Sequence, residues 1–349
     1  MLLNLRLSCC TLAILLSAAV ASAQQPSPSS APSPDFIYLD VVVTPKNGPP
    51  VSGLQAQDFT VLDNNVPAPI NSFQAVAAAQ SAVECIVVID DVNTGLQNVA
   101  YERSEIDKFL LADGGHLPFP AALAFLSDSG IQLQDGFSKD GNVLSASLHQ
   151  HSTGLHAISR ASGIYGAIER FQISLDALLA LANREASRPG RKFILWISPG
   201  WPLLSGPGVE QQMDDKQRRQ IFSDVVQLST LLRQGRVTLY SIDPLGASDF
   251  AGRAFYWQSF TKGIKNPNQA DWGDVALQVL AVQSGGLALN ISNDIYAALK
   301  KCTEDAQSYY ELSFAPPLEH KPSEYHQLEI RVDKSGLIAR TRLGYYSQP

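Results

Sequence analysis

The central part of the chain alternates strand-like and helix-like segments, and this alternation limits the fold more than any other feature. Largely apolar runs at residues 85–89, 121–126 and 192–197 lack a polar alternation, which indicates strands that are covered on both faces. A long amphipathic segment at 162–186 carries apolar residues at helical spacing. Strands that alternate with helices form parallel sheets. We therefore expect an α/β domain with a doubly wound, mostly parallel sheet over residues 83–308.

The segments on either side of this domain, residues 35–78 and 309–349, have the composition of β-strands. Their strand-like runs are rich in β-branched and aromatic residues and are separated by turn residues. The expected strands include 36–43, 58–62, 309–315, 325–332 and 338–346. Neither segment alone has enough strands for a stable core. We expect the two segments to form one β-sandwich into which the α/β domain is inserted, although two separate small modules remain an alternative.

The first 23 residues have the three parts of a cleavable signal peptide. A short region with Arg6 precedes an apolar stretch at 7–20, and Ala21-Ser-Ala23 matches the small-residue cleavage pattern. Residues 24–34 are rich in Pro, Ser and Gln and are expected to form a disordered linker. The chain is thus predicted to be exported, to the periplasm or beyond the cell, with an uncleaved N-terminal anchor as the alternative. A second apolar run of membrane-spanning length is absent from the sequence, so no membrane insertion is expected after cleavage.

The net charge limits which partners the chain attracts, and the cysteine content limits which disulfide bonds it can form. The formal net charge is −7, which gives no general attraction to nucleic acid or to an anionic membrane. Cleavage of the signal peptide leaves only Cys85 and Cys302. Export permits a disulfide, but two cysteines so far apart in sequence do not make a disulfide framework. Two buried free thiols are the favoured expectation.

Several short segments, in a fixed order along nearly the whole mature chain, carry a resemblance to a known family. They include Pro-Val-Ser-Gly-Leu at 50–54, Ile-Asp-Asp-Val-Asn-Thr at 89–94, and Arg-Lys-Phe-Ile-Leu-Trp-Ile-Ser-Pro-Gly at 191–200. The chain resembles the VWFA-related proteins of acidobacterial genomes, which contain a von Willebrand factor A-like domain. The resemblance implies a binding or adhesion protein whose partner is a protein or another cell-surface ligand.

The resemblance also implies a metal-ion-dependent adhesion site, in which Mg²⁺ takes oxygen ligands in octahedral geometry. Asp90, Thr94 and Ser162 fall on ligand positions of that site and keep a side-chain oxygen. Val92 and Pro199 fall on two further ligand positions and offer none. The implied cofactor, Mg²⁺ or Mn²⁺, would therefore bind at a degenerate site. The alternative is that the carboxylate caps a neighbouring helix or binds amides of its own loop.

Two tryptophans are predicted to contact the partner. Trp201 directly follows Ser-Pro-Gly at 198–200, which the resemblance places where A domains contact ligands. Trp257 lies in an insertion at 246–273 that is rich in Gly and Trp, and aromatic side chains are frequent anchors of interfaces. Alternatively, the aromatic side chains of the insertion cover a small core of its own.

Recognisable catalytic motifs are missing from the sequence. A nucleophile elbow, a phosphate-binding loop and a dinucleotide fingerprint do not occur, and Ser259-Phe-Thr-Lys262 lacks the partner motifs of penicillin-binding enzymes. We expect a non-enzymatic binding protein. One alternative is a structural component of a cell-envelope assembly in which the metal loop is a relic; a second is a hydrolase with an unrecognised site.

Overall fold

The computed structural model describes most of the chain. The described residues are 36–77, 82–151, 163–202, 204, 213–246, 255–318 and 321–348. The predicted signal peptide at 1–23 and the linker at 24–34 lie outside these ranges. Within the described ranges, every helix is too short or too polar to cross a membrane.

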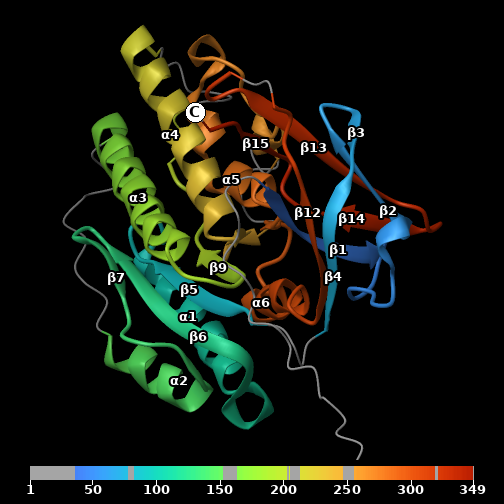
Figure 1. Cartoon of the computed structure of the whole chain (residues 1–349). Helices are drawn as coiled ribbons and strands as arrows, with labels where there is room; N and C mark the ends of the chain where they lie inside the picture. Colours follow the sequence, from blue (N-terminus) through green and yellow to red (C-terminus); the bar gives the residue numbers. More distant parts are fainter. Residues whose placement is uncertain are drawn as a thin grey trace, which may run out of the picture. The chain divides into compact units, whose positions relative to one another are not determined.

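A mostly parallel sheet forms the centre of the α/β part (Figure 1). Its strands, in spatial order, are β11 (Ala288–Leu289), β10 (Val237–Ile242), β9 (Lys192–Ile197), β5 (Glu84–Asp90), β6 (His116–Ser127) and β7 (Gly130–Leu133). The short strand β8 (Ser138–Asp140) also pairs with β6. Strands β5, β6, β9, β10 and β11 are parallel, whereas β7 and β8 pair antiparallel with β6. The prediction of a mostly parallel sheet is confirmed.

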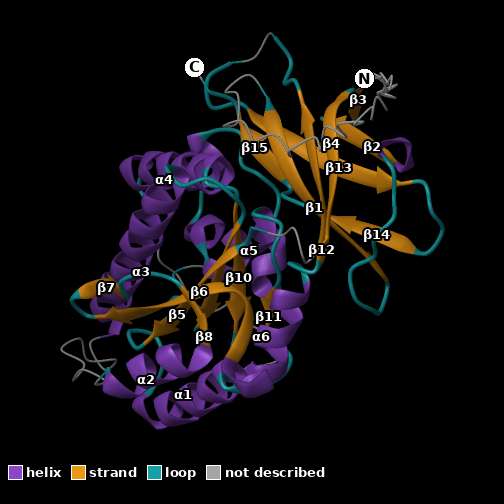
Figure 2. Ribbon diagram, turned by 60° about the horizontal axis from the view of Figure 1, so that its bottom comes forward, coloured by secondary structure: helices purple, strands orange, loops and turns teal. Residues whose placement is uncertain are grey.

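Helices cover both faces of this sheet (Figures 1 and 2). On one face lie α1 (Leu96–Leu110), α2 (Gly141–Gln150) and α6 (Ile295–Glu304). On the other lie α3 (Gly163–Ala186), α4 (Asp215–Gln234) and α5 (Leu277–Gln283). Because side chains alternate along a strand, Ile86 and Val88 of β5 pack in the core beneath α3 and α4, while Val87 and Ile89 pack beneath α1 and α6. The doubly wound arrangement follows from this two-sided burial.

Short 3-10 helices lie in the connecting segments. They are η1 (Ala56–Asp58), η3 (Ala112–Gly115), η6 (Tyr256–Phe260), η7 (Pro267–Gln269) and η8 (Trp272–Val275). Three of them, η6, η7 and η8, lie within the predicted insertion at 246–273 or at its end. Phe260 of η6 packs close to Gly273 of η8, and Trp272 packs against Phe171 of α3 with ring centroids 5.5 Å apart. The described part of the insertion, residues 255–273, is therefore folded onto the α/β part.

The two terminal β segments form a sandwich of two antiparallel sheets. One sheet has the order β14 (Leu337–Arg340), β1 (Ile37–Pro45), β12 (Ser308–Phe314) and β4 (Ile70–Ala77). The other has the order β15 (Gly344–Tyr346), β13 (Tyr325–Val332), β2 (Phe59–Asp63) and β3 (Val66–Ala68). Strands from both ends of the chain pair directly, with Val41 opposite Tyr310 and Val61 opposite Ile330. Their inward side chains share one core, as expected for a sandwich that contains an inserted domain.

One predicted strand needs a correction. The segment 338–346 was expected to be continuous, but the structure divides it into β14 and β15, which belong to different sheets. Thr341 and Arg342, between them, are buried at the junction with the α/β part. The Arg342 guanidinium donates to the carbonyl oxygen of Leu232, near the C-terminus of α4, at 3.4 Å. Between the two sheets, the chain thus contacts the C-terminal end of α4 through Arg342.

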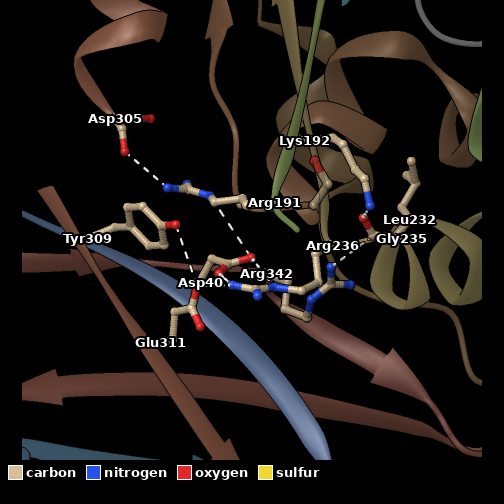
Figure 3. Close-up of polar contacts among 12 residues, drawn as sticks. Asp40, Arg191, Lys192, Leu232, Gly235, Arg236, Asp305, Tyr309, Glu311 and Arg342 are labelled. Atoms are coloured by element: carbon tan, nitrogen blue, oxygen red, sulfur yellow. Dashed lines mark hydrogen bonds and ion pairs between the residues drawn. The ribbon is translucent and has the colours of Figure 1, made fainter. Parts of the chain in front are cut away.

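A largely buried charge network joins the sandwich to the α/β part (Figure 3), with Arg191 fully buried and Asp40, Arg236 and Glu311 partly buried. Asp40 of β1 accepts hydrogen bonds from Arg236, which follows α4, and Arg236 also binds Glu311 of β12 at 2.6 Å. The Nε atom of Arg191 lies 3.9 Å from the Asp40 carboxylate. Burial alone would raise the pKa of Asp40, but the Arg236 and Arg191 guanidinium groups hold it below its ordinary value. Asp40 therefore neutralises cations from the α/β part.

Arg191 extends this network across the junction. Its guanidinium lies 4.3 Å from the ring centroid of Tyr309 and 4.7 Å from that of Phe193. It also donates to the backbone oxygen of Asp305 at 3.0 Å, and the Asp305 carboxylate accepts from Tyr240 at 2.6 Å and from Arg340. Cation–π contacts are stronger when the partners are desolvated, so Arg191 contributes packing as well as charge.

Cys85 and Cys302 are unbonded. Cys85 lies on β5 and Cys302 on α6, and both are buried in the core beneath α1 and α6, as the favoured expectation stated. Burial raises the pKa of each thiol well above its ordinary value. We predict that a thiol reagent such as DTNB titrates neither cysteine in the native protein and both after denaturation. Loss of the signal in the denatured protein without reductant, restored by reductant, would instead reveal a disulfide.

Candidate functional site

The candidate site lies at the carboxyl ends of β5 and β9. The chain proceeds from β5 to β6 on one side and later returns to β9 on the other side, so the winding direction reverses between β5 and β9. In open α/β sheets, ligands bind at the carboxyl ends of strands where this reversal occurs. Asp90 ends β5, and Ser198 directly follows β9. The fold therefore places the predicted metal loop at the expected position.

Asp90 is fully buried and is held by nitrogen donors. The backbone N–H of Asn93 donates to Oδ1 at 2.9 Å, and the Asn93 side-chain amide donates to Oδ2 at 2.9 Å. The indole N–H of Trp196, on β9, also donates to Oδ2, at 3.0 Å. Burial raises the pKa of Asp90, while the hydrogen bonds from Asn93, Trp196 and Ser198 oppose that rise. The carboxylate binds the amides of its own loop, as one of the two sequence interpretations stated.

Asn93 connects this loop to the neighbouring helix. Its side-chain amide also donates to the Ser174 hydroxyl on α3 at 2.9 Å, and that hydroxyl donates to the Arg170 carbonyl at 2.8 Å. Asn93 and Ser174 are both buried. The segment between β5 and α1 is thus fixed to α3 through a chain of hydrogen bonds that begins at Asp90.

The other predicted metal ligands are placed differently. Thr94 is buried, and its hydroxyl lies beside the Glu102 carboxyl. This hydroxyl partly offsets the rise that burial causes in the pKa of Glu102. Ser162 lies outside the described residues. Val92 is buried in the apolar core beneath α3 and α4, and Pro199 has no oxygen in its side chain. Asp90 and Thr94 are therefore close in the chain, but the Asp90 carboxylate contacts N–H donors whereas the Thr94 hydroxyl lies beside the Glu102 carboxyl.

Sequence reasoning missed two acidic residues in this region. Glu102 of α1 is fully buried, and Asp243, which follows β10, is nearly so. Burial raises the pKa of Glu102 to about 9, and the charges of Asp90, Asp91 and Asp243 add to this rise. The sequence positions of both residues could have indicated that they are buried near this site. Glu102 lies three residues after Val99, on the buried face of the predicted helix, and Asp243 follows an apolar strand that ends at the same edge.

The residues present do not fit a divalent cation. Both Asp90 oxygens accept hydrogen bonds from N–H groups, which occupy lone pairs that Mg²⁺ or Mn²⁺ would need. Val92 and Pro199 supply no oxygen to replace them. Across the described ranges, no three His, Cys, Asp or Glu side chains are grouped so that they could hold a metal ion.

The two predicted partner contacts differ in exposure. Trp201 is only 6% exposed, and its ring lies 5.6 Å from that of Trp196 and 6.1 Å from that of Phe171. Its prediction as a partner anchor is corrected to a core role, because the loop after β9 folds the indole under α3. Trp257, in η6, is partly buried, and its partner contact stays a prediction.

Several exposed apolar side chains lie on segments at the same edge of the sheet as the buried polar loop. Tyr101 projects from the second turn of α1, and its hydroxyl binds the Asn293 carbonyl at 2.7 Å. Ile291 lies between β11 and α6 and is 71% exposed, while Ile164 and Tyr165 begin α3, with Tyr165 81% exposed. Helix α1 follows the parallel strand β5, Ile291 follows the parallel strand β11, and α3 leads back into the parallel strand β9, so these segments lie at the carboxyl edge of the sheet. We call Tyr101, Ile164, Tyr165 and Ile291 the apolar rim.

Comparisons with known proteins give only distant likenesses. No family model and no curated protein matches the sequence. Solved structures with a similar arrangement include the PilB minor pilin from Streptococcus sanguinis (9% identity, 65% of this chain and 62% of the pilin, TM-score 0.34). A second is the manganese-loaded TRAP protein from Plasmodium vivax (11% identity, 79% of this chain and 98% of TRAP, TM-score 0.35). A third is the SpaC pilus adhesin from Lactobacillus rhamnosus GG (9% identity, 85% of this chain and 49% of the adhesin, TM-score 0.37). The chain spans less than two thirds of the pilin and about half of the adhesin. Because each of these TM-scores is below 0.5, the likenesses carry no argument about function.

Proposed function

We propose that this chain is an exported, non-enzymatic binding protein that recognises a protein or a cell-surface polymer through the carboxyl edge of its central sheet. The observation that carries the proposal is the apolar rim. Large apolar side chains scattered singly over a surface are ordinary. Here four of them lie on segments that meet the carboxyl edge of the central sheet, the edge where α/β sheets bind ligands.

The rigidity of the underlying scaffold supports this role. The hydrogen bonds of Asp90 and Asn93 fix the segment between β5 and α1 to β9 and α3. Tyr101 binds the loop before α6, and so joins a third segment. Loops that a rigid scaffold positions lose less conformational entropy when they bind a partner. The face is therefore suited to binding without large rearrangement.

Truncation of the rim should weaken binding. We expect Tyr165→Ala and Ile291→Ala each to raise the Kd for the partner by about tenfold, in line with a loss above about 1 kcal/mol at an anchor residue. Val143→Ala is the matched control, because Val143 on α2 is also exposed but lies outside the rim. Binding of envelope components to the immobilised mature protein, measured by biolayer interferometry, gives the comparison. Equal affinities for all three variants and the wild type would exclude the rim as the binding face.

A second candidate function is a structural role in a cell-envelope assembly, and the edge strand β4 favours it. In the described chain β4 pairs only with β12, and residues 66–77 contain no charged side chain. Edge strands usually carry charges that prevent pairing with other chains. Asn71→Lys, on the exposed part of β4, should disrupt an assembly built on this edge and should leave binding at the rim unchanged.

A further inference from the structure

We propose that Trp196 and Asn93 take the place of a cation at the end of β5, so that N–H donors of the chain itself stabilise the buried Asp90 carboxylate. Hydrogen bonds, rather than a metal ion, then hold the loop that the sequence resemblance assigned to a metal site. These hydrogen bonds hold the loop whether or not the apolar rim binds a partner. We call Asp90, Asn93 and Trp196 the carboxylate lock.

The need for such a lock follows from burial. A carboxylate without solvent exposure is costly unless charged or hydrogen-bonding partners compensate it. Asp90 is 0% exposed, and its contacts are the Asn93 backbone N–H, the Asn93 amide and the Trp196 indole N–H, all within 3.0 Å. Hydrogen bonds to an ionised acceptor are roughly twice as strong as neutral ones. Three such donors, helped by the Ser198 hydroxyl, give Asp90 the compensation that a cation would otherwise supply.

The charges around the lock also oppose a simple ion pair. The Arg103 guanidinium is directed to Asp91, at 3.8 Å, and its other nitrogen donates to the His151 carbonyl at 2.6 Å. Glu102 of α1 and Asp243 after β10 are acidic residues near this loop and add no positive charge to it. Neutral N–H donors therefore carry the compensation of Asp90.

The sheet register explains why an indole can reach the carboxylate. Val88 of β5 lies opposite Trp196 of β9, and Asp90 is two residues further along β5, on the same face as Val88. The Trp196 indole therefore has to reach only from the level of Val88 to that of Asp90, the next residue on the same face of β5, to bring its Nε1 atom to Asp90 Oδ2. This geometry depends on a large side chain at position 196, because a smaller one would leave the carboxylate without that donor.

The chain contains a matched control for the indole N–H. Trp201 packs against Trp196 in the same core and is nearly as buried. In the described structure the Trp201 Nε1 atom has no hydrogen-bond partner. Trp196→Phe and Trp201→Phe make the same chemical change in one aromatic cluster, and only the former removes a donor from Asp90.

The test compares melting temperatures of the purified mature protein in EDTA, in millimolar Mg²⁺ and in millimolar Mn²⁺. We expect Trp196→Phe to lower the Tm by several degrees more than Trp201→Phe does. In an Asp90→Asn background this difference should shrink, because a double-mutant cycle isolates the interaction between the two side chains. The wild-type Tm should be the same in all three solutions.

An NMR measurement covers the case in which a variant does not fold. In the wild type, the Trp196 indole proton should resonate downfield of the other indole protons and exchange slowly with solvent. Three results would overturn the proposal: equal Tm losses for the two Trp variants, a Mg²⁺- or Mn²⁺-dependent rise in the wild-type Tm that Asp90→Asn abolishes, or a rapidly exchanging Trp196 indole proton.

Discussion

Replacement of Asp40 by alanine is expected to lower the free energy of unfolding by about 3–5 kcal/mol. Asp40 is the carboxylate that Arg236 and Arg191 share at the junction of the sandwich and the α/β part. The exposed fraction of the Arg191 side chain is 1%, and that of Arg236 is 14%. Removal of their common partner leaves the buried Arg191 without its carboxylate and leaves Arg236 with Glu311 alone, which costs more than the loss of an ordinary surface ion pair.

Glu311→Ala is the matched control for this substitution. Glu311 binds the same nitrogen of Arg236, but its side chain is 29% exposed and Asp40 remains in place when it is removed. We expect a loss of about 1 kcal/mol or less, as for a partly exposed pair. Urea unfolding of the mature protein, followed by circular dichroism, measures both values. An Asp40→Ala loss no larger than the Glu311→Ala loss would show that the network does not hold the two parts together.

Glu102→Gln is expected to stabilise the protein near neutral pH by about 3 kcal/mol. The pKa of Glu102 rises from 4.5 to about 9 in the folded protein, chiefly through burial. Between these values the folded state binds a proton that the unfolded state has released, so the stability contributed by this group falls as pH increases. Each pH unit in that interval costs about 1.4 kcal/mol. Glutamine resembles the protonated acid and avoids the cost.

The pH profile distinguishes this effect from a general one. The difference in unfolding free energy between Glu102→Gln and the wild type should be close to zero near pH 4.5, and should grow steadily toward pH 9. Glu105→Gln is the control, since Glu105 lies on the same helix and is partly exposed. A constant difference across the pH range, or a destabilised Glu102→Gln protein at neutral pH, would contradict burial of a protonated Glu102.

Much of the fold could be predicted because it depends on local patterns. The apolar run from Cys85 to Ile89 is buried on both faces of its strand, and its composition predicts that burial directly. The pairing of the terminal β segments was predicted from the lack of strands in each one alone. Division of the segment 338–346 between two sheets could not be predicted, because it depends on Arg342 reaching the Leu232 carbonyl on a distant helix.

The candidate site was predictable in position but not in chemistry. Asp90 stands at a strand end, and that position alone places it at the binding edge. Its donor Trp196 is 106 residues away in sequence, and an apolar strand that contains a tryptophan gives no sign that its indole N–H binds a carboxylate. The burial of Trp201 was missed for the same reason, because the position of an aromatic residue after a strand does not decide which way its ring turns.

The most direct test of the central claim is the affinity of the mature protein for its captured envelope partner, measured in Mg²⁺ and in EDTA. The claim is that the carboxyl edge of the central sheet binds this partner through the apolar rim, above a loop that Asp90 and its N–H donors hold without a metal. We predict equal Kd values in the two solutions and a Kd about tenfold higher for Tyr165→Ala in both. Loss of binding in EDTA, or a Tyr165→Ala Kd equal to that of the wild type, would contradict it.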